Sequence, residues 1–261
     1  MEGEGYSEGV EDEEAAMRDG LWWRCDADPG VVLSREQVRR LDRLAEERLG
    51  MSGLVLMENA STAVAAGVMR LLEGREEGGV LVVCGGGNNG GDGLGAARKL
   101  HVRGVEGVRV VLLKDGAAMA GDAGAFARMC AGVGVAMEVL DAGDVAGCLE
   151  RAGGEAGASG GVIVDAMFGT GLDRALGAPL DEVVGWMEAR RGMGARVLAV
   201  DVPSGMDADT GEALGGVAVR ADATVTLAAV KRGMLTEAGR ARCGEVWVGD
   251  IGVARWLVEE V

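Results

Sequence analysis

The residues best suited to chemistry lie in one glycine-rich stretch of the chain. An apolar run from Val80 to Cys84 leads directly into Gly85-Gly86-Gly87-Asn88-Asn89-Gly90-Gly91-Asp92-Gly93. Glycine adopts backbone angles that other residues reach only at a cost, and without a Cβ its amide N–H group can approach an anion closely. A helix that follows such a loop adds a favourable dipole. The stretch predicts a nucleotide-binding turn between a strand and a helix.

Two common phosphate-binding patterns can be compared with this loop. A Walker loop needs Gly-Lys-Ser/Thr where the helix begins, but this chain has Gly91-Asp92-Gly93 there, which argues against phosphate transfer. The dinucleotide fingerprint fits formally over Gly85 to Gly90, with Asp115 as a ribose-binding acid beyond the next strand. A type I′ turn at Asn88–Asp92 is the purely structural alternative.

Two further segments combine an acid with glycine and small polar residues. Asp165 lies in the segment 164–172, and Asp201 opens the segment 201–207, which contains Ser204. Ligands of parallel α/β sheets bind beyond the carboxyl ends of the strands, so we expect both segments and the glycine loop to face one crevice. Taken alone, either acid could be only a helix cap or a turn residue.

These three segments could together hold a cation or exchange a proton. Oxygen atoms of Asn89, Asp165 and Ser204 would form a cage without histidine or cysteine, which suits a hard cation rather than zinc. With one or two formal charges, the cage favours a monovalent ion. Asp165 and Asp201 could also divide acid and base roles if their environments separate their pKa values.

Composition limits the classes of partner. The chain has 261 residues, with 42 acidic and 26 basic side chains and a formal charge of -16. This charge opposes binding to nucleic acid or to an anionic membrane, so we expect small-molecule partners. No basic start or apolar core of a signal peptide is found, and we expect no run of about 18 apolar residues to span a bilayer. A cytoplasmic location is predicted.

The first 20 residues differ from the rest. They interleave glutamate with glycine and little that could pack, which predicts a disordered acidic tail, followed by one domain over 21–261. The single histidine, His101, is expected at the surface, and its isolation argues against histidine triads and zinc sites. Five scattered cysteines without a C-x-x-C pair predict buried reduced thiols: Cys25, Cys84, Cys130, Cys148 and Cys243.

Periodicity predicts alternating helices and strands. Ser34-Arg35-Glu36-Gln37 has capping-box spacing and opens an amphipathic helix that ends before Gly50, and a second helical stripe follows Gly53. Continuous apolar runs indicate strands buried on both faces, at 80–84, 108–113, 135–140, 161–165, 196–201 and 223–228. The fold class is therefore α/β, a Rossmann-like three-layer αβα sandwich with a mostly parallel sheet.

Several segments in succession resemble a known family. Leu56-Met57-Glu58-Asn59-Ala60, Cys84 to Leu94, Val164 to Leu172, Asp201 to Gly211 and Cys243 to Gly252 are similar, in order and spacing, to blocks of the NAD(P)H-hydrate epimerase family, also called the YjeF N-terminal domain. The similarity covers roughly residues 31–253, and the combined motifs are far more specific than one glycine loop.

The resemblance implies epimerisation of NADHX and NADPHX, nicotinamide cofactors hydrated on the ring, between their R and S forms. It implies one potassium ion per subunit, bound by Asn89, Asp165 and Ser204. It also implies that substrate is bound by these residues: Asn88, Asn89, Gly90, Gly91, Asp92, Gly169, Thr170, Gly171, Leu172, Asp173, Arg174, Ala175 and Asp201.

The proton could be moved by Asp165, our first candidate for acid and base, or by Lys231. A surface lysine near a helix end is the structural alternative for Lys231, and Arg174 could pair either with a pyrophosphate or with a surface acid. Two positions depart from the family pattern. Gly86 replaces a common proline, and Ala229-Val230-Lys231-Arg232 replaces alanine-proline-lysine-proline.

The family also implies partners and leaves rivals. A homodimer and a separate dehydratase that consumes the S epimer are expected. An NAD-dependent oxidoreductase remains an alternative, supported by the fingerprint and Asp115 but lacking an obvious catalytic histidine or tyrosine–lysine pair. A noncatalytic nucleotide-binding protein is the second alternative.

Overall fold

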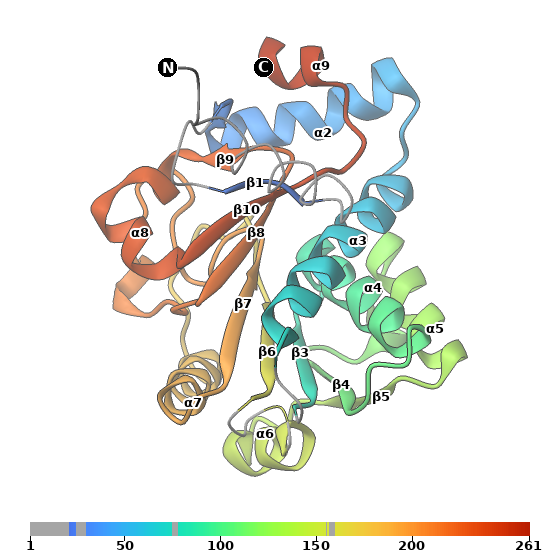
Figure 1. Ribbon diagram of the computed structural model, residues 1–261, viewed down its shortest axis with the longest axis vertical. Coiled ribbons are helices and arrows are strands. Elements are labelled where there is room, and N and C mark those ends of the chain that lie inside the picture. Colours follow the sequence, from blue (N-terminus) through green and yellow to red (C-terminus); the bar gives the residue numbers. More distant parts are fainter. Residues whose placement is uncertain (1–20, 25–29, 75–77, 155, 157–159) are drawn as a thin grey trace, which may run out of the picture.

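A mostly parallel eight-stranded sheet forms the centre of the computed structural model, which describes residues 21–24, 30–74, 78–154, 156 and 160–261. The strand order is β1-β10-β8-β7-β6-β3-β4-β5, and β1 pairs antiparallel with β10 (Figure 1). The strands are β1 (Leu21–Arg24), β3 (Val80–Cys84), β4 (Val108–Leu112), β5 (Ala136–Val139), β6 (Val162–Ala166), β7 (Arg196–Val200), β8 (Ala223–Leu227) and β10 (Glu245–Gly249).

The six strands expected from apolar runs are confirmed as β3 to β8. In β3 and β6 every residue is buried, as a central parallel strand requires. Strands β1 and β10 were not predicted, nor was the two-stranded parallel sheet of β2 (Val32–Leu33) and β9 (Val230–Lys231). Strands of two residues are too short to show any period.

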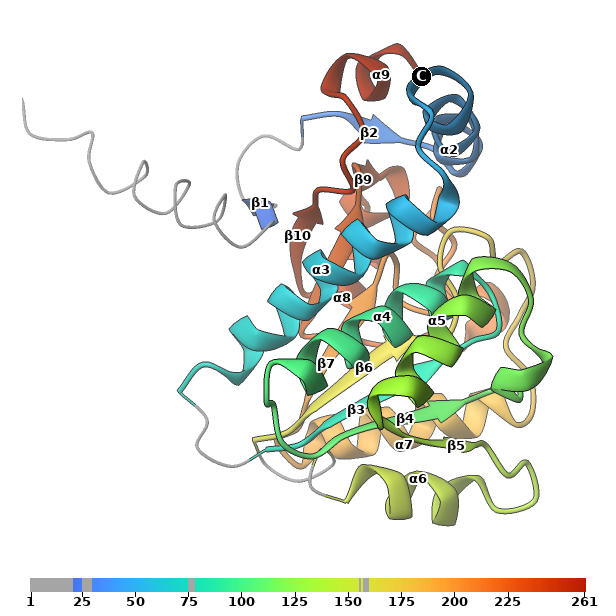
Figure 2. The same cartoon turned by 90° about the vertical axis from the view of Figure 1, so that its right-hand side faces the viewer.

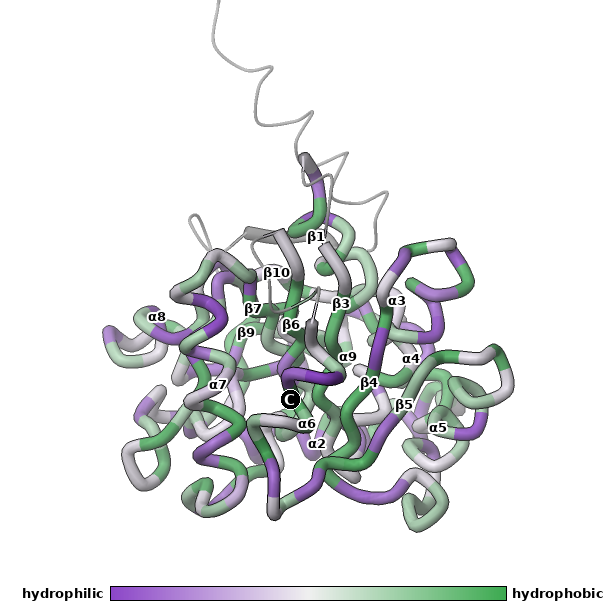
Figure 3. The backbone as a smooth tube through the Cα atoms, turned by 90° about the horizontal axis from the view of Figure 1, so that it is seen from below, coloured by the Kyte–Doolittle hydropathy of each residue, from purple (hydrophilic) through white to green (hydrophobic). Residues whose placement is uncertain are grey.

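Helices cover both faces of the sheet and confirm the three-layer sandwich (Figure 2). On one face, α3 (Gly53–Leu72), α4 (Asn88–Val102) and α5 (Gly121–Val133) pack on Val80, Val82 and Cys84 of β3. On the other, α6 (Val145–Gly153) and α7 (Leu180–Gly192) pack on Leu81 and Val83. The central strands are accordingly hydrophobic in Figure 3.

Helix α2 (Arg35–Leu49) lies across one end of the sheet, beside α9 (Arg255–Glu260), as Figure 1 shows. The predicted capping box is confirmed, because Ser34 accepts from the backbone of Gln37 and the Gln37 side chain accepts from Ser34. Gly50 ends the helix in a left-handed conformation with φ 67°. The remaining elements are α8 (Glu237–Cys243), η1 (Gly116–Ala118), η2 (Leu214–Gly216) and η3 (Arg232–Leu235).

Helix α3 corrects one expectation from the sequence. Its 20 residues are long and apolar enough to cross a membrane by length and composition, the one such helix among the described residues. The expectation that no such run exists was therefore wrong. In the structure α3 packs against α4 and the sheet, and its apolar stripe, with Met57, Val64 and Val68, belongs to the core. Burial on the sheet accounts for this stripe, whereas Leu54, Val55 and Met69 of the same helix are exposed.

Two predictions concern residues outside the described part of the chain, namely the acidic tail and Cys25. Cys84, Cys130, Cys148 and Cys243 are buried.

Candidate functional site

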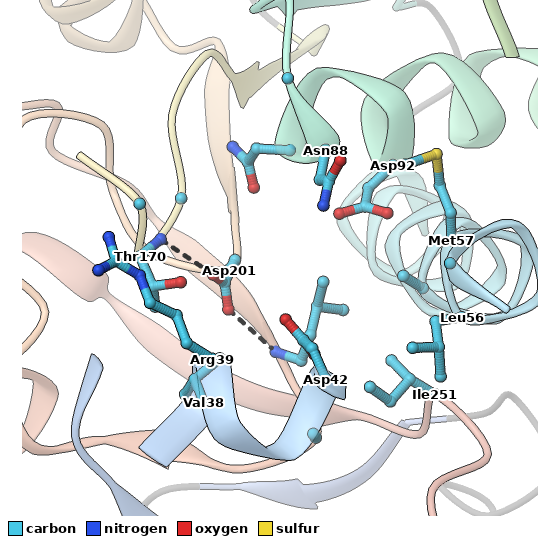
Figure 4. Close-up of a pocket in the computed structure, with 18 of the residues that line it drawn as sticks. Val38, Arg39, Asp42, Leu56, Met57, Asn88, Asp92, Thr170, Asp201 and Ile251 are labelled. Atoms are coloured by element: carbon cyan, nitrogen blue, oxygen red, sulfur yellow. Dashed lines mark hydrogen bonds between the residues drawn. The ribbon is translucent and has the colours of Figure 1, made fainter. Parts of the chain in front are cut away.

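A cavity of about 830 Å³ opens at the carboxyl ends of β3 and β6. From β3 the chain continues outward to β4 and β5, whereas from β6 it continues to β7 and β8 on the other side. This reversal is the topological switch point at which α/β sheets bind ligands. Four regions line the cavity: helix α2, the start of α3, the first turn of α4, and the loops after β6, β7, β8 and β10 (Figure 4).

The predicted turn after β3 is the first turn of helix α4, which begins at Asn88, and not a type I′ turn. Gly87 is the N-cap and offers no side chain to the helix, so the first amide N–H groups keep no side-chain cap. Asn88, Asn89 and Asp92 line the cavity. This end of α4 can therefore receive an anion such as a phosphate.

Two glycines of the turn allow close packing around α4. A Cβ on Gly90 would collide with the Gly85 carbonyl oxygen, and a Cβ on Gly91 would collide with the side chain of Met57. Neither glycine lines the cavity. Both allow α4 to pack closely, so they position the site without facing it.

The structure also places Asp115, the acid suggested by the dinucleotide fingerprint, and His101, which was expected at the surface. Asp115 caps η1 by accepting a hydrogen bond from Ala117 N at 2.9 Å and does not line the cavity. It is therefore not a ribose-binding acid of this site. His101 lies half-buried near the end of α4, with Nε2 3.2 Å from the carbonyl oxygen of Val133.

The loop after β6 forms a second wall. All of 169–174 lines the cavity, whereas Ala175 does not and packs over Gly215. Thr170 N donates a hydrogen bond to Asp201 Oδ2 at 3.2 Å. Arg174 is exposed and forms no ion pair within the described part of the chain, so its guanidinium is available to a charged ligand.

Asp201 lines the cavity and has a left-handed backbone conformation, φ 67°, which is unusual for a residue other than glycine. Its Oδ1 is 2.5 Å from Lys231 Nζ. Lys231 is fully buried and also donates to Thr226 Oγ1 at 2.9 Å and to the Leu227 carbonyl oxygen at 2.8 Å. The interpretation of Lys231 as a surface lysine is wrong, and it reaches the cavity only through Asp201.

Asp165 and Ser204 meet behind the cavity wall. Asp165 Oδ1 accepts from Ser204 Oγ at 2.6 Å and from Met167 N at 3.3 Å, and its Oδ2 accepts from Ser204 N at 2.8 Å. Both side chains are fully buried and neither lines the cavity. Burial raises the pKa of Asp165 to about 6, and the hydrogen bonds from Ser204 and Met167 oppose that shift.

The third proposed cation ligand approaches from α4. The Oδ1 atom of Asn89 lies against Gly169, next to Phe168, whose carbonyl oxygen contacts Ser204 Oγ at 3.2 Å. Asn89 Nδ2 is buried and has no hydrogen-bond partner among the described residues. Asp201 Oδ2 approaches the same side of Gly169 as Asn89 Oδ1, so the oxygen atoms around this loop come from Asn89, Ser204, Phe168 and the carboxylates of Asp165 and Asp201. A donor set made only of oxygen atoms fits a hard cation. Within the described residues no cluster of three His, Cys, Asp or Glu side chains is arranged for a metal.

The sequence analysis missed the contribution of helix α2. Arg39, Asp42, Arg43 and Glu46 line the cavity from its polar face. Although the Asp42 side chain is exposed to the cavity, desolvation by the surrounding protein and the charge of Asp201 raise its pKa, and Lys231 and Arg43 oppose the shift. The helical spacing of these polar residues was visible, but nothing in the sequence placed α2 over the strand ends.

The fold and cavity define a Rossmann-like α/β protein with a ligand site at the switch point. The family described as YjeF-related protein N-terminus matches residues 53–233. The chain belongs to this YjeF N-terminal family.

Related proteins extend the match beyond that segment. An NAD(P)H-hydrate epimerase of Rhodopirellula baltica is 37% identical over 86% of this chain and 86% of its own length. A bifunctional NAD(P)H-hydrate repair enzyme of Thermofilum pendens is 42% identical, but this chain spans only 40% of its length. The crystal structure of yeast YNL200c has a TM-score of 0.74 over 88% of this chain and 92% of that chain, at 24% identity, and shares its fold.

Proposed function

We propose that this protein interconverts the R and S forms of NADHX and NADPHX in the repair of hydrated nicotinamide cofactors. The observation that carries the proposal is a switch-point cavity that combines an anion-receiving helix end with a buried Asp201–Lys231 ion pair. The NAD(P)H-hydrate epimerases among the relatives support it.

The arrangement suits a dinucleotide with a reactive ring. The first turn of α4 and the loop 169–174, with Arg174 at its edge, would bind the diphosphate. The deeper part of the cavity would then hold the hydrated ring near Asp201. Loss of the ring hydroxyl as water leaves an iminium-like cation, and the carboxylate of Asp201, held by Lys231, would stabilise that charge.

Asp165 and Lys231 were the two catalytic candidates from the sequence. In this proposal neither contacts the substrate, and both act through other residues. Asp165 has all of its strong hydrogen bonds to Ser204 and the chain and lies behind the wall. Lys231 positions Asp201. Proton exchange with substrate is therefore assigned to carboxylates that line the cavity.

Potassium would be held by Asn89, Asp165 and Ser204. A cation there supplies a counter-charge for the buried Asp165 and draws together the ends of β6 and β7 with the start of α4. We further propose a homodimer and a cytoplasmic location. Relatives described as bifunctional repair enzymes support coupling to a dehydratase that consumes the S epimer.

The test is conversion of purified R-NADHX in the presence of an S-specific dehydratase, with and without potassium. We expect rapid consumption that depends on potassium and is lost in Asp165→Asn. No acceleration over buffer, with NADH still bound, would favour a noncatalytic nucleotide-binding protein. Hydride transfer from NADH to an added carbonyl substrate would instead favour an oxidoreductase.

A further inference from the structure

Two carboxylates converge on one end of the cavity from different helices. Asp42 extends from α2, and Asp92 extends from α4 just after its first turn, as Figure 4 shows. Between them lies an apolar floor of Leu56, Met57 and Ile251. We call this space the acidic chamber. A planar ring of low polarity would fit between its two acids and against its floor.

Neither acid is satisfied by the protein. Asp92 is only 7% exposed, yet no hydrogen bond or ion pair to its carboxylate is found among the described residues, and the same holds for Asp42. Buried polar groups in folded proteins are nearly always hydrogen-bonded, so a largely buried carboxylate without such a bond is available to a ligand, a water molecule or an ion in the cavity. Asp92 is thus an unpartnered acid aimed into the cavity.

We propose that Asp42 and Asp92 are the acid–base pair of the epimerase, each acting on one face of the hydrated ring. The inference rests on the proposed function. It assigns a catalytic role to a helix that lies outside the glycine loop and the strand-end motifs. It also explains why the chemistry needs two cavity-lining acids, because epimerisation removes oxygen from one face and returns it to the other.

Epimerisation follows the same course in either direction. The protonated acid on one face gives its proton to the ring hydroxyl, the C–O bond breaks, and its electron pair leaves with the water formed. The ring nitrogen lone pair becomes the C=N bond of the cation. On the other face a water oxygen attacks the same carbon, the C=N pair returns to nitrogen, and the second carboxylate takes the proton of the water. Exchange of one proton with solvent in the open cavity restores the pair.

The environment disfavours the charged form of both acids, and more strongly that of Asp92. Desolvation by burial and repulsion from Asp201 and Asp42 raise the pKa of Asp92 well above its usual range, and Lys231 opposes this. Such a pair titrates as a unit. The charged groups that face Asp42 are Asp201, Lys231 and Arg43, together with Arg39 and Glu46 on the cavity rim.

The experiment compares epimerisation rates of Asp42→Asn and Asp92→Asn with the wild-type protein in potassium. We expect each variant to lose activity by about 100-fold or more, the range of a general acid or base, while the Kd for NADH changes by less than about threefold. Bell-shaped pH dependence of the wild-type rate should lose one limb in each variant. Glu47→Gln is the matched control, because it removes an exposed carboxylate from the same helix outside the cavity.

The possible results distinguish the acid–base pair from the epimerase activity on which it rests. A wild-type protein that does not epimerise NADHX overturns both. An active wild-type protein with either variant at the wild-type rate overturns the acid–base pair and leaves the epimerase standing. Thermal unfolding of both variants near the wild-type temperature shows that a lost rate does not come from a lost fold.

Discussion

Asp165 and Asp92 are both buried carboxylates with raised pKa values, yet they are bonded in opposite ways. Asp165 accepts hydrogen bonds from Ser204 and Met167 and is closed off from the cavity, whereas Asp92 has no such partner among the described residues and lines the cavity. The bonded acid joins the ends of β6 and β7, and the unbonded one is left for a ligand. Burial alone therefore does not identify a catalytic acid, and the state of its hydrogen bonds does.

The largest effect is expected at Asp201, which combines both features, because it lines the cavity and pairs with a buried lysine. Asp201→Asn leaves the ammonium of Lys231 buried without its counter-charge, which should lower the free energy of unfolding by roughly 3–5 kcal/mol. Epimerisation should be lost as well. Urea unfolding and the coupled assay measure the two effects.

A double variant separates stability from chemistry at this pair. Asp201→Asn with Lys231→Met removes the uncompensated charge and should recover most of the lost stability, because well-packed apolar residues replace buried ion pairs at little cost. Activity should not return. Equal stability of the single and double variants would show that Lys231 does not depend on Asp201.

Next in size is the pH dependence of stability that comes from Asp165. Its pKa is about 6 in the folded protein against the ordinary aspartate value of 3.8, so the folded state holds the proton more tightly than the unfolded chain. The stability it contributes is fully present below pH 3.8 and is lost as the pH rises through about 6. The loss is about 3 kcal/mol.

This dependence should be measured by urea unfolding in potassium-free buffer. Asp165→Asn cannot titrate and should lack this part of the pH dependence, although it also weakens the hydrogen bonds with Ser204. Identical pH profiles for the variant and the wild-type protein would contradict the assignment. Added potassium should flatten the wild-type profile if the cation binds beside the ionised carboxylate.

The same contrast shows what the sequence could predict. Strands β3 to β8 were predicted because runs rich in apolar residues are a local property of the chain. The capping box of Ser34 and Gln37 is local too, and it set the start of α2. The strand-end segments with Asp165 and Asp201 were placed correctly beside the cavity because parallel sheets bring their carboxyl ends together.

What the sequence did not predict depends on contacts between distant segments. Lys231 is buried because it packs against Asp201 and the end of β8. No local sequence pattern distinguishes it from a surface lysine. Asp42 lies on the polar face of an amphipathic helix, where most acids are solvated. Only the packing of α2 over the strand ends turns that face into a cavity wall.

The smallest effect on stability, and the sharpest contrast with Asp165, is expected for Asp92→Asn. Among the described residues the Asp92 carboxylate makes no hydrogen bond that the amide would lose, and burial, which raises its pKa, makes its charged form costly in the folded protein. An asparagine of nearly the same shape should therefore leave the free energy of unfolding within about 0.5 kcal/mol of the wild-type value or raise it slightly. Asp165→Asn, which disrupts several hydrogen bonds, should cost about 1–3 kcal/mol under the same conditions. Paired urea titrations at pH 7 compare the two, and a loss at Asp92 as large as that at Asp165 would mean that Asp92 also holds the fold together.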